Sequence, residues 1–201
     1  MTTTFDKLGV ADDLVHALSE RGIDSAFAIQ EMTIPDILAG RDVCGKAKTG
    51  SGKTLAFGLP LLQILPRAQP GRPTGLALVP TRELATQVRD ELLPLAHARG
   101  VRITAIYGGD PIDKQIKALK TGVDLAVCTP GRAIDLIERG DLSVADVRHV
   151  VIDEADRMAV ADRPADFDVP ATAASGGRKR QREWQQPRAG TQELGKRERC
   201  D

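Results

Sequence analysis

Two short stretches of the sequence carry side chains whose types and spacing suggest chemistry on phosphate groups. The first is AKTGSGKT at residues 47–54, in which two glycines precede Lys53 and Thr54. Glycines at this spacing let backbone N–H groups turn toward an anion, and a lysine directly after them can reach the phosphates of a bound nucleotide. The stretch therefore has the form of a phosphate-binding loop, with Ala47 where the first glycine usually stands.

The second stretch is the acidic quartet DEAD at residues 153–156, which follows the apolar run VVI. Such a quartet on its own more often begins a helix, and the phosphate loop on its own could be a flexible Gly-Ser connection. Together they predict a nucleotide site: Asp153 and Thr54 would hold Mg²⁺, and Glu154 would orient and activate the attacking water.

Alternating strands and helices must bring these residues together. Runs of Val, Ile, Leu and Ala without a polar face are typical of parallel strands covered on both sides, and the segments between them have the apolar stripes of helices. We expect strands at 42–47, 74–80, 101–109, 123–130 and 148–156, and helices at 11–22, 29–38, 53–65, 81–100, 111–122 and 130–140. The predicted fold class is an α/β doubly wound parallel sheet.

Every unusual stretch follows one of these strands. AKTGSGKT, PTRELA, Gly-Gly, TPGR and DEAD come after the first to the fifth in turn. Because ligands of open parallel sheets bind at the carboxyl ends of the strands, the five stretches define one binding face.

The composition limits the class of protein more weakly. Hydrophobic residues make up 41% of the chain, enough for a core, and 28 basic residues balance 28 acidic ones, so net charge neither indicates nor excludes a nucleic-acid partner. Three unpaired cysteines indicate a reducing cytoplasm, with Cys44 and Cys128 expected to be buried. No signal peptide or membrane-spanning run is evident, and the three histidines lack metal-ligand spacing.

Taken together, these motifs resemble the DEAD-box RNA helicases from residue 5 to about residue 158. The resemblance implies a RecA-like P-loop NTPase domain that binds ATP, Mg²⁺ and RNA, with Lys53, Asp153 and Glu154 in catalytic roles. The ATP site implied by it comprises Phe5, Gln30, Ala47, Lys48, Thr49, Gly50, Ser51, Gly52, Lys53 and Thr54. The segment RGIDSAFAIQ resembles the adenine-contacting segment of the family: Gln30 would contact the adenine edge and Phe5 would stack on the base, although Ala26 replaces the usual proline.

The resemblance also assigns RNA contacts to three of the strand ends. The implied RNA-binding residues are Pro80, Thr81, Arg82, Gly108, Gly109, Thr129, Pro130, Gly131 and Arg132. Helix N-termini and hydroxyl or guanidinium groups bind phosphate and ribose without reading bases, so we expect sequence-independent binding of single strands or short duplexes. Thr81 and Pro130 are also typical helix-capping residues, and the two roles are compatible. The choice of RNA over DNA rests on the resemblance.

We divide the chain into N-terminal helices with the adenine-contacting segment (1–40), a partial ATP-binding domain (41–159) and a tail (160–201). The tail is poor in apolar residues, so we expect it to be disordered and cleaved first at residues 178–182. By resemblance, the SAT motif and the second helicase domain are missing, and ATAAS at 171–175 does not replace the motif. We therefore expect a gap between the strands at 42–47 and 148–156, and an inactive chain that is marginally folded or aggregates.

Three classes of function are compatible with the phosphate loop. They are an ATP-dependent RNA helicase, here as a truncated first domain; a catalytically inactive ATP- or RNA-binding fragment; and another phosphate-loop enzyme such as a nucleotide kinase. Gln30, PTRELA and TPGR argue against the kinase.

Overall fold

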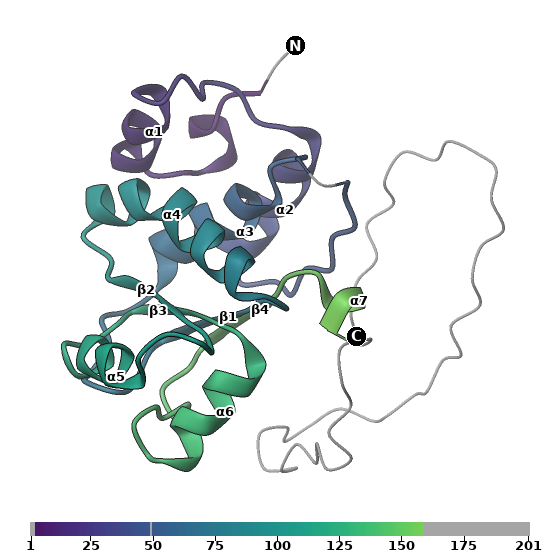
Figure 1. Cartoon of the computed structure of the whole chain (residues 1–201). Coiled ribbons are helices and arrows are strands. Elements are labelled where there is room, and N and C mark those ends of the chain that lie inside the picture. The colour runs from purple at the N-terminus through teal and green to yellow at the C-terminus, as the bar shows by residue number, and fades with distance from the viewer. Residues whose placement is uncertain (1–2, 49, 159–201) are drawn as a thin grey trace, which may run out of the picture.

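The computed structural model describes residues 3–48 and 50–158, and its centre is a sheet of four parallel strands (Figure 1). The strands are β1 (Gly75–Leu78), β2 (Ile103–Ile106), β3 (Leu125–Cys128) and β4 (His149–Ile152), in the order β2-β3-β1-β4. Leu76 of β1 lies beside Ala126 of β3 and Val150 of β4. Since consecutive strands run parallel, each connection crosses over through a helix.

Helices cover both faces of this sheet, which confirms the doubly wound α/β fold. Figure 1 shows the first four α-helices on one side and α5 and α6 on the other. The elements are a 3-10 helix (Asp6–Leu8), α1 (Asp12–Ser19), α2 (Ala28–Leu38), α3 (Lys53–Ile64), α4 (Arg82–Arg99), α5 (Ile112–Lys120), α6 (Pro130–Glu138) and α7 (Ala155–Met158). α2 packs on α3, and α4 packs on both α3 and α1.

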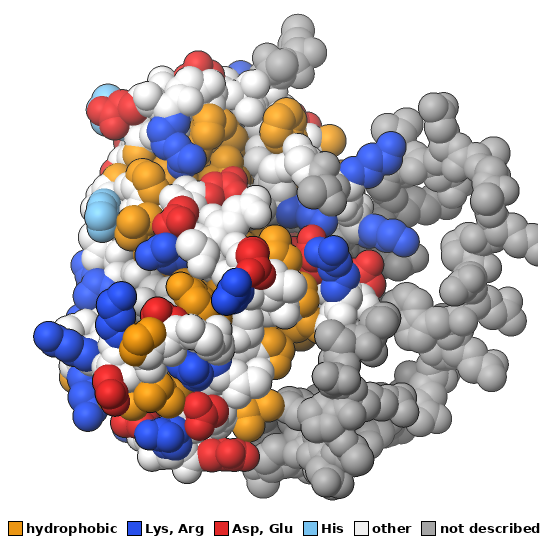
Figure 2. All heavy atoms as spheres, in the orientation of Figure 1, with side chains coloured by type: hydrophobic (Ala, Val, Ile, Leu, Met, Phe, Trp, Pro, Cys, Tyr) orange, Lys and Arg blue, Asp and Glu red, His pale blue; other side chains and the backbone are white. Residues whose placement is uncertain are grey.

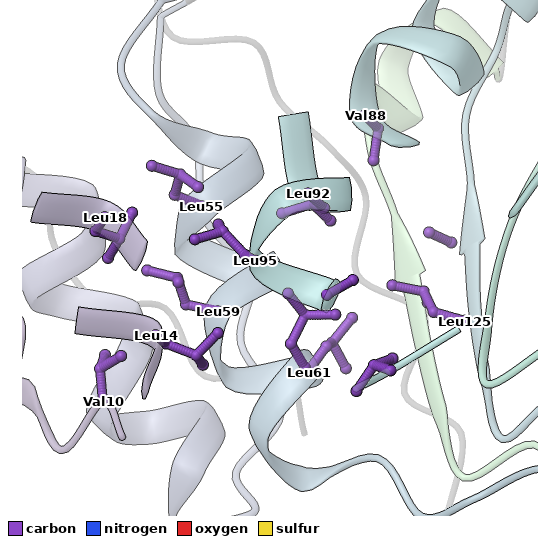
Figure 3. Close-up of a cluster of buried hydrophobic side chains, with 14 of the residues drawn as sticks. Val10, Leu14, Leu18, Leu55, Leu59, Leu61, Val88, Leu92, Leu95 and Leu125 are labelled. Atoms are coloured by element: carbon purple, nitrogen blue, oxygen red, sulfur yellow. The ribbon is translucent and has the colours of Figure 1, made fainter. Parts of the chain in front are cut away.

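The core is divided by the sheet into two apolar clusters. Alternate residues of a strand point to opposite faces, so Ala77 of β1 joins the larger cluster with α1, α3 and α4, and Leu76 joins the smaller one with α5 and α6. Figure 3 shows the larger cluster, in which Leu59 and Leu92 are fully buried. This packing holds α3, and with it the end of the phosphate loop, rigidly over the sheet.

The helix boundaries follow the sequence signals. Thr81 caps α4, its hydroxyl accepting a hydrogen bond from the N–H of Leu84 at 3.3 Å, and Gly100 ends the helix in the left-handed region with φ 68°. Pro130 occupies the first turn of α6 as expected. Pro35 lies inside α2 without ending it, because the helix is held against α3.

The predicted strand at 42–47 is wrong. Within this segment only Cys44 forms an isolated β-bridge, and the segment is not part of the sheet. A strand needs a partner for its backbone groups, and an open cleft separates this segment from β4. Cys44 is consequently exposed rather than buried, whereas Cys128 is buried as expected, and burial raises the pKa of its thiol.

A buried carboxylate connects the loops at the amino ends of the strands, opposite the carboxyl ends that carry the motifs. The side chain of Asp124, just before β3, is 1% exposed. It accepts hydrogen bonds from the backbone N–H groups of Ala68 at 2.7 Å and Arg102 at 2.8 Å. It also pairs with the guanidinium groups of Arg102 at 3.0 Å and Arg67 at 3.1 Å. Burial alone would raise the pKa of Asp124, but these hydrogen bonds outweigh it and hold the pKa below its usual value.

The predictions for Thr49, Ala159 and the tail at 160–201 lie outside the described residues. In the part of the chain that is described, no helix has the length and apolar character needed to cross a membrane.

Candidate functional site

The phosphate loop ends at a glycine that no other residue could replace without strain. Gly50 and Gly52 have φ values of 79° and 78°, and Gly52 is the N-cap of α3. A Cβ atom on Gly52 would lie 2.3 Å from Nε2 of Gln30 and 2.8 Å from the ring of Phe27. The hydroxyl of Ser51, between the two glycines, is buried without a hydrogen-bond partner, which a bound anion could supply.

Gln30 connects the start of α2 to this loop. Its Nε2 donates to the carbonyl oxygen of Gly52 at 3.0 Å, and its Oε1 accepts from the N–H of Phe27 at 2.8 Å. The side chain lies three residues into α2 and is buried, with Gln30 1% exposed. Gln30 therefore holds the predicted adenine-contacting segment and the phosphate loop in a fixed relation.

The structure does not bring Phe5 to this site as an exposed stacking surface. Phe5 is 1% exposed and packs in the larger core cluster with Leu8, Val10 and Leu14. The exposed aromatic side chain beside the loop is instead Phe27, at 58%. Phe27 stands at the N-cap of α2, where Ser, Thr, Asp or Asn is usual.

Lys53 and Asp153 line the same cleft, although they are far apart in the sequence. The cleft, of about 260 Å³, lies between β4, α2, α3 and residues 41–45. Burial raises the pKa of Asp153, while the charge of Lys53 and the hydrogen bond from the N–H of Glu154 partly counter this effect. An ammonium group and a half-buried carboxylate at one cleft are suited to a phosphate and its counter-ion.

Glu154 is the only described non-glycine residue with a positive φ, at 52°. This left-handed conformation is costly for a side chain with a Cβ, and such strain gathers at functional sites. Its carboxylate pairs with Arg157 at 2.7 Å in the first turn after β4. The predicted catalytic carboxylate is thus present at the strand end but engaged by a neighbouring cation.

Of the three remaining strand-end motifs, PTRELA and Gly-Gly line a second cleft, and TPGR lies beside it. This cleft, of about 450 Å³, is lined by Arg82, Glu83, Thr86, Tyr107, Gly109 and Asp110. The guanidinium of Arg132, whose side chain is 13% exposed, donates to the carbonyl oxygen of Asp110 at 3.3 Å. PTRELA, Gly-Gly and TPGR are therefore brought together, as the placement at the strand ends predicted.

The other members of these motifs are accessible or partly accessible. Thr81, Gly108 and Gly131 are exposed, and Pro80, Thr129 and Pro130 are partly buried; in the phosphate loop, Lys48 is exposed and Ala47 partly buried. The hydroxyl of Thr129 does not cap α6, so it is not needed for that helix end. Figure 2 shows basic and acidic side chains interspersed on the face in view, which suits contacts to individual phosphates better than attraction by a single charged patch.

An open parallel sheet with a glycine-rich loop before a helix, and an acidic motif after a neighbouring strand, defines the class of phosphate-loop α/β proteins. The chain belongs to the DEAD/DEAH box helicase family, whose sequence model matches residues 27–182. This match extends past residue 159, where we place the end of the helicase-like segment, so that boundary stays a prediction.

Individual relatives agree with this assignment. The chain is 46% identical over 154 residues to the DEAD-box ATP-dependent RNA helicase CshA of Streptococcus pneumoniae, covering 77% of this chain and 29% of that protein. It is 47% identical over 157 residues to the ATP-dependent RNA helicase DeaD of Haemophilus influenzae, covering 77% and 25%. The crystal structure of a DEAD box protein from Methanococcus jannaschii matches 78% of this chain and 43% of that one, with a TM-score of 0.72 and 38% identity. The chain thus spans less than a third of the length of these curated relatives.

Proposed function

We propose that the chain is the ATP-binding part of an ATP-dependent RNA helicase. The observation that carries the proposal is the convergence of Lys53 and Asp153 on one cleft beside the glycine-rich loop. Lys53 contacts the β- and γ-phosphates, the loop N–H groups and the N-terminus of α3 hold the remaining oxygens, and Gln30 fixes the adenine end. The second helicase domain of the relatives would supply the groups needed for strand separation.

Mg²⁺ fits this donor set. The hydroxyl of Thr54 and the carboxylate of Asp153 are hard oxygen ligands, and Mg²⁺ is commonly held by one or two carboxylates together with substrate phosphates. Among the residues that the structure describes, no group of three His, Cys, Asp or Glu side chains could hold a metal alone, so phosphate oxygens are needed to complete the coordination. When bound, Mg²⁺ neutralises charge on the phosphates.

RNA binds at the second cleft in this proposal. Arg82 and Arg132 contact phosphates, the exposed backbone of Gly108 and Gly109 allows close approach, and Thr129 contacts ribose hydroxyls. None of these groups is arranged to read base edges, so binding is independent of sequence.

The test is calorimetric titration with Mg·ATP. Lys53→Ala should lose most of the affinity, while Lys117→Ala, which removes an exposed lysine on α5, should bind like the unmodified chain. Equal affinity of all three proteins would contradict the nucleotide site.

A catalytically inactive ATP- and RNA-binding fragment is the second candidate, favoured by the ion pair of Glu154 with Arg157. A carboxylate held by a cation is a weaker base toward water. RNA-stimulated phosphate release that Glu154→Gln abolishes would decide for the enzyme. Release at the level of the Glu154→Gln variant, with intact ATP binding, would decide for the fragment.

A further inference from the structure

We propose that Gln115 is a positioning residue, which holds the Gly-Gly turn (residues 107–110) in the orientation that contacts the RNA backbone. Gln115 lies on α5 and belongs to none of the strand-end motifs. The inference rests on the proposed RNA site and adds a residue that acts on this site through the protein backbone. Its test includes a measurement without RNA, so the two proposals can fail separately.

Gln115 is a polar residue at a core position of its helix. It is 5% exposed, and Leu119, one turn further along the same face of α5, is fully buried. Glutamine is uncommon at such a position, because burying an amide group is costly unless its polar atoms find partners. One partner is present, since Nε2 of Gln115 donates to the carbonyl oxygen of Tyr107 at 2.9 Å. The amide therefore reaches the first residue after β2, where the Gly-Gly turn begins.

The hydrogen bonding of this amide does not account for its presence through stability of the fold. Its Oε1 is buried without a hydrogen-bond partner. Rotating the amide would not supply one, because Oε1 would then face the carbonyl oxygen of Tyr107, and both atoms are acceptors. One bond gained and one acceptor left unsatisfied nearly cancel, so an apolar side chain of the same length would stabilise the fold equally well. The effect of Gln115 is therefore to be found in the backbone that it holds.

The bond to Tyr107 fixes the direction of the next N–H group. In a trans peptide unit the C=O and N–H bonds point in opposite directions, and the described residues contain no cis peptide bond. Because the carbonyl of Tyr107 is directed toward Gln115, the N–H of Gly108 points away from that side chain. Gly108 and Gly109 are both exposed, and neither donates its N–H to another described residue. The turn thus presents a free N–H group in a fixed orientation.

This N–H group lies near a cation that suits the same anion. A Cβ atom built on Gly109 would lie 3.6 Å from a guanidinium nitrogen of Arg82. The far end of the turn is held as well, since Arg132 donates to the carbonyl oxygen of Asp110 at 3.3 Å. An RNA phosphate bound by Arg82 accepts a second hydrogen bond from the N–H of Gly108. Without the bond from α5, the peptide unit that carries this N–H is free to rotate, because glycine permits many backbone conformations.

The test replaces Gln115 by methionine, which has the same length and no amide group. Gln115→Met should weaken the binding of fluorescein-labelled decauridylate in fluorescence anisotropy by about 10-fold, the loss expected for one hydrogen bond to a charged group. The slope of log K against log salt concentration should stay unaltered, because the lost donor is neutral, whereas Arg82→Ala should lower that slope. The affinity for Mg·ATP and the midpoint of urea unfolding should also stay unchanged.

Gln63→Met is the matched control, because Gln63 on α3 has both polar atoms of its amide paired. Its Oε1 accepts from the N–H of Ala11 at 2.9 Å, and its Nε2 donates to the carbonyl oxygen of Gly9 at 3.0 Å. Gln63→Met should therefore lower the midpoint of urea unfolding and leave the affinity for decauridylate unaltered. The same chemical change thus gives opposite results at the two positions.

NMR spectra of the chain labelled with ¹⁵N-glycine report on the turn without RNA. Gln115→Met should shift or broaden the amide resonances of Gly108 and Gly109, which are identified by their loss in Gly108→Ala and Gly109→Ala, and Gln63→Met should not. Unchanged glycine resonances or unchanged RNA affinity in Gln115→Met would overturn the proposal. A loss of RNA affinity together with a lower urea midpoint or a lower salt slope would also overturn it, because Gln115 would then serve the fold in general. If the unmodified chain does not bind decauridylate, the proposed RNA site itself fails, and the glycine resonances still decide whether Gln115 fixes the turn.

Discussion

Removing the carboxylate of Asp124 should destabilise the fold more than any other change to a single ion pair of the described residues. Asp124→Ala leaves the backbone N–H groups of Ala68 and Arg102 without acceptors, and a buried unsatisfied group costs about 1–3 kcal/mol. The two together give about 2–6 kcal/mol. The ion pairs add little, because Arg67 and Arg102 are 63% and 43% exposed and solvent screens them. A domain of this size has only about 5–15 kcal/mol of stability in total.

Asp124→Asn is the milder variant that keeps the test interpretable if the alanine variant does not fold. Its amide oxygen can accept from one of the two N–H groups, so the expected loss is about 1–3 kcal/mol. The matched control is Asp146→Asn, since Asp146 pairs with Arg72 at 2.7 Å but both side chains are substantially exposed, at 38% and 48%. That surface pair should contribute less than about 1 kcal/mol.

Urea denaturation followed by circular dichroism measures these free energies of unfolding. The pH dependence gives a second measurement. Because the folded pKa of Asp124 is lowered, its contribution is present above the unfolded pKa and lost as pH falls through the folded pKa. The difference between the unmodified chain and Asp124→Asn should therefore persist at neutral pH and shrink in acid. Equal destabilisation by Asp124→Asn and Asp146→Asn would refute the reasoning.

Three further predictions concern the two clefts. Gly52→Ala should abolish measurable ATP binding, because its Cβ would collide with Gln30. Gly50 has nearly the same φ, but a Cβ there would meet nothing within 4 Å, so Gly50→Ala should weaken ATP binding less in the same titration. The reverse order of the two variants would contradict this. Arg82→Ala should weaken RNA binding measured by fluorescence anisotropy. It should also lower the slope of log K against log salt concentration by about 0.7, the value for one lost phosphate contact, whereas Lys117→Ala should leave that slope unaltered. Because burial raises the pKa of Asp153, the affinity for Mg·ATP should begin to fall on acidification at a higher pH than an ordinary aspartate would cause. Asp153→Asn should remove this pH dependence. Identical profiles of affinity against pH for the unmodified chain and the variant would count against a role of Asp153.

The strand-end motifs could be placed from the sequence because their signals are local. A short apolar run such as LAVC between turn residues favours a buried strand, and a threonine or proline after it favours the start of the next helix. In a parallel sheet the carboxyl ends of all strands lie on the same side, so Arg82, Gly109 and Arg132 were expected to lie close together. No knowledge of packing was needed for that inference.

The features that the sequence did not indicate depend on packing between distant segments. Phe5 is buried in the larger core cluster, which no local pattern indicates, and its predicted contact with the base stays a prediction. Asp124 was overlooked although it interrupts an apolar run between Val123 and Leu125; its role depends on loops 56 and 22 residues away. The segment 42–47 has the composition of a strand, but pairing decides whether a strand forms.

The open side of β4 leads to a last prediction, that the isolated chain self-associates through this strand. The N–H group of His149 donates to Thr74, just before β1, and that of Asp153 donates to Leu78 of β1. By alternation, the N–H groups of Val150 and Ile152 point away from the sheet, and both residues are more than half exposed. In the described sheet β4 is an edge, and β4 itself carries no lysine or proline, the residues that commonly protect such edges. Val150→Lys should reduce the concentration-dependent mass in sedimentation velocity, because charge opposes edge pairing. Ile137→Lys introduces the same charge on α6, whose backbone is already hydrogen-bonded, and should not. A chain that stays monomeric at all concentrations, or that both lysines affect equally, would show that the edge of β4 is not responsible.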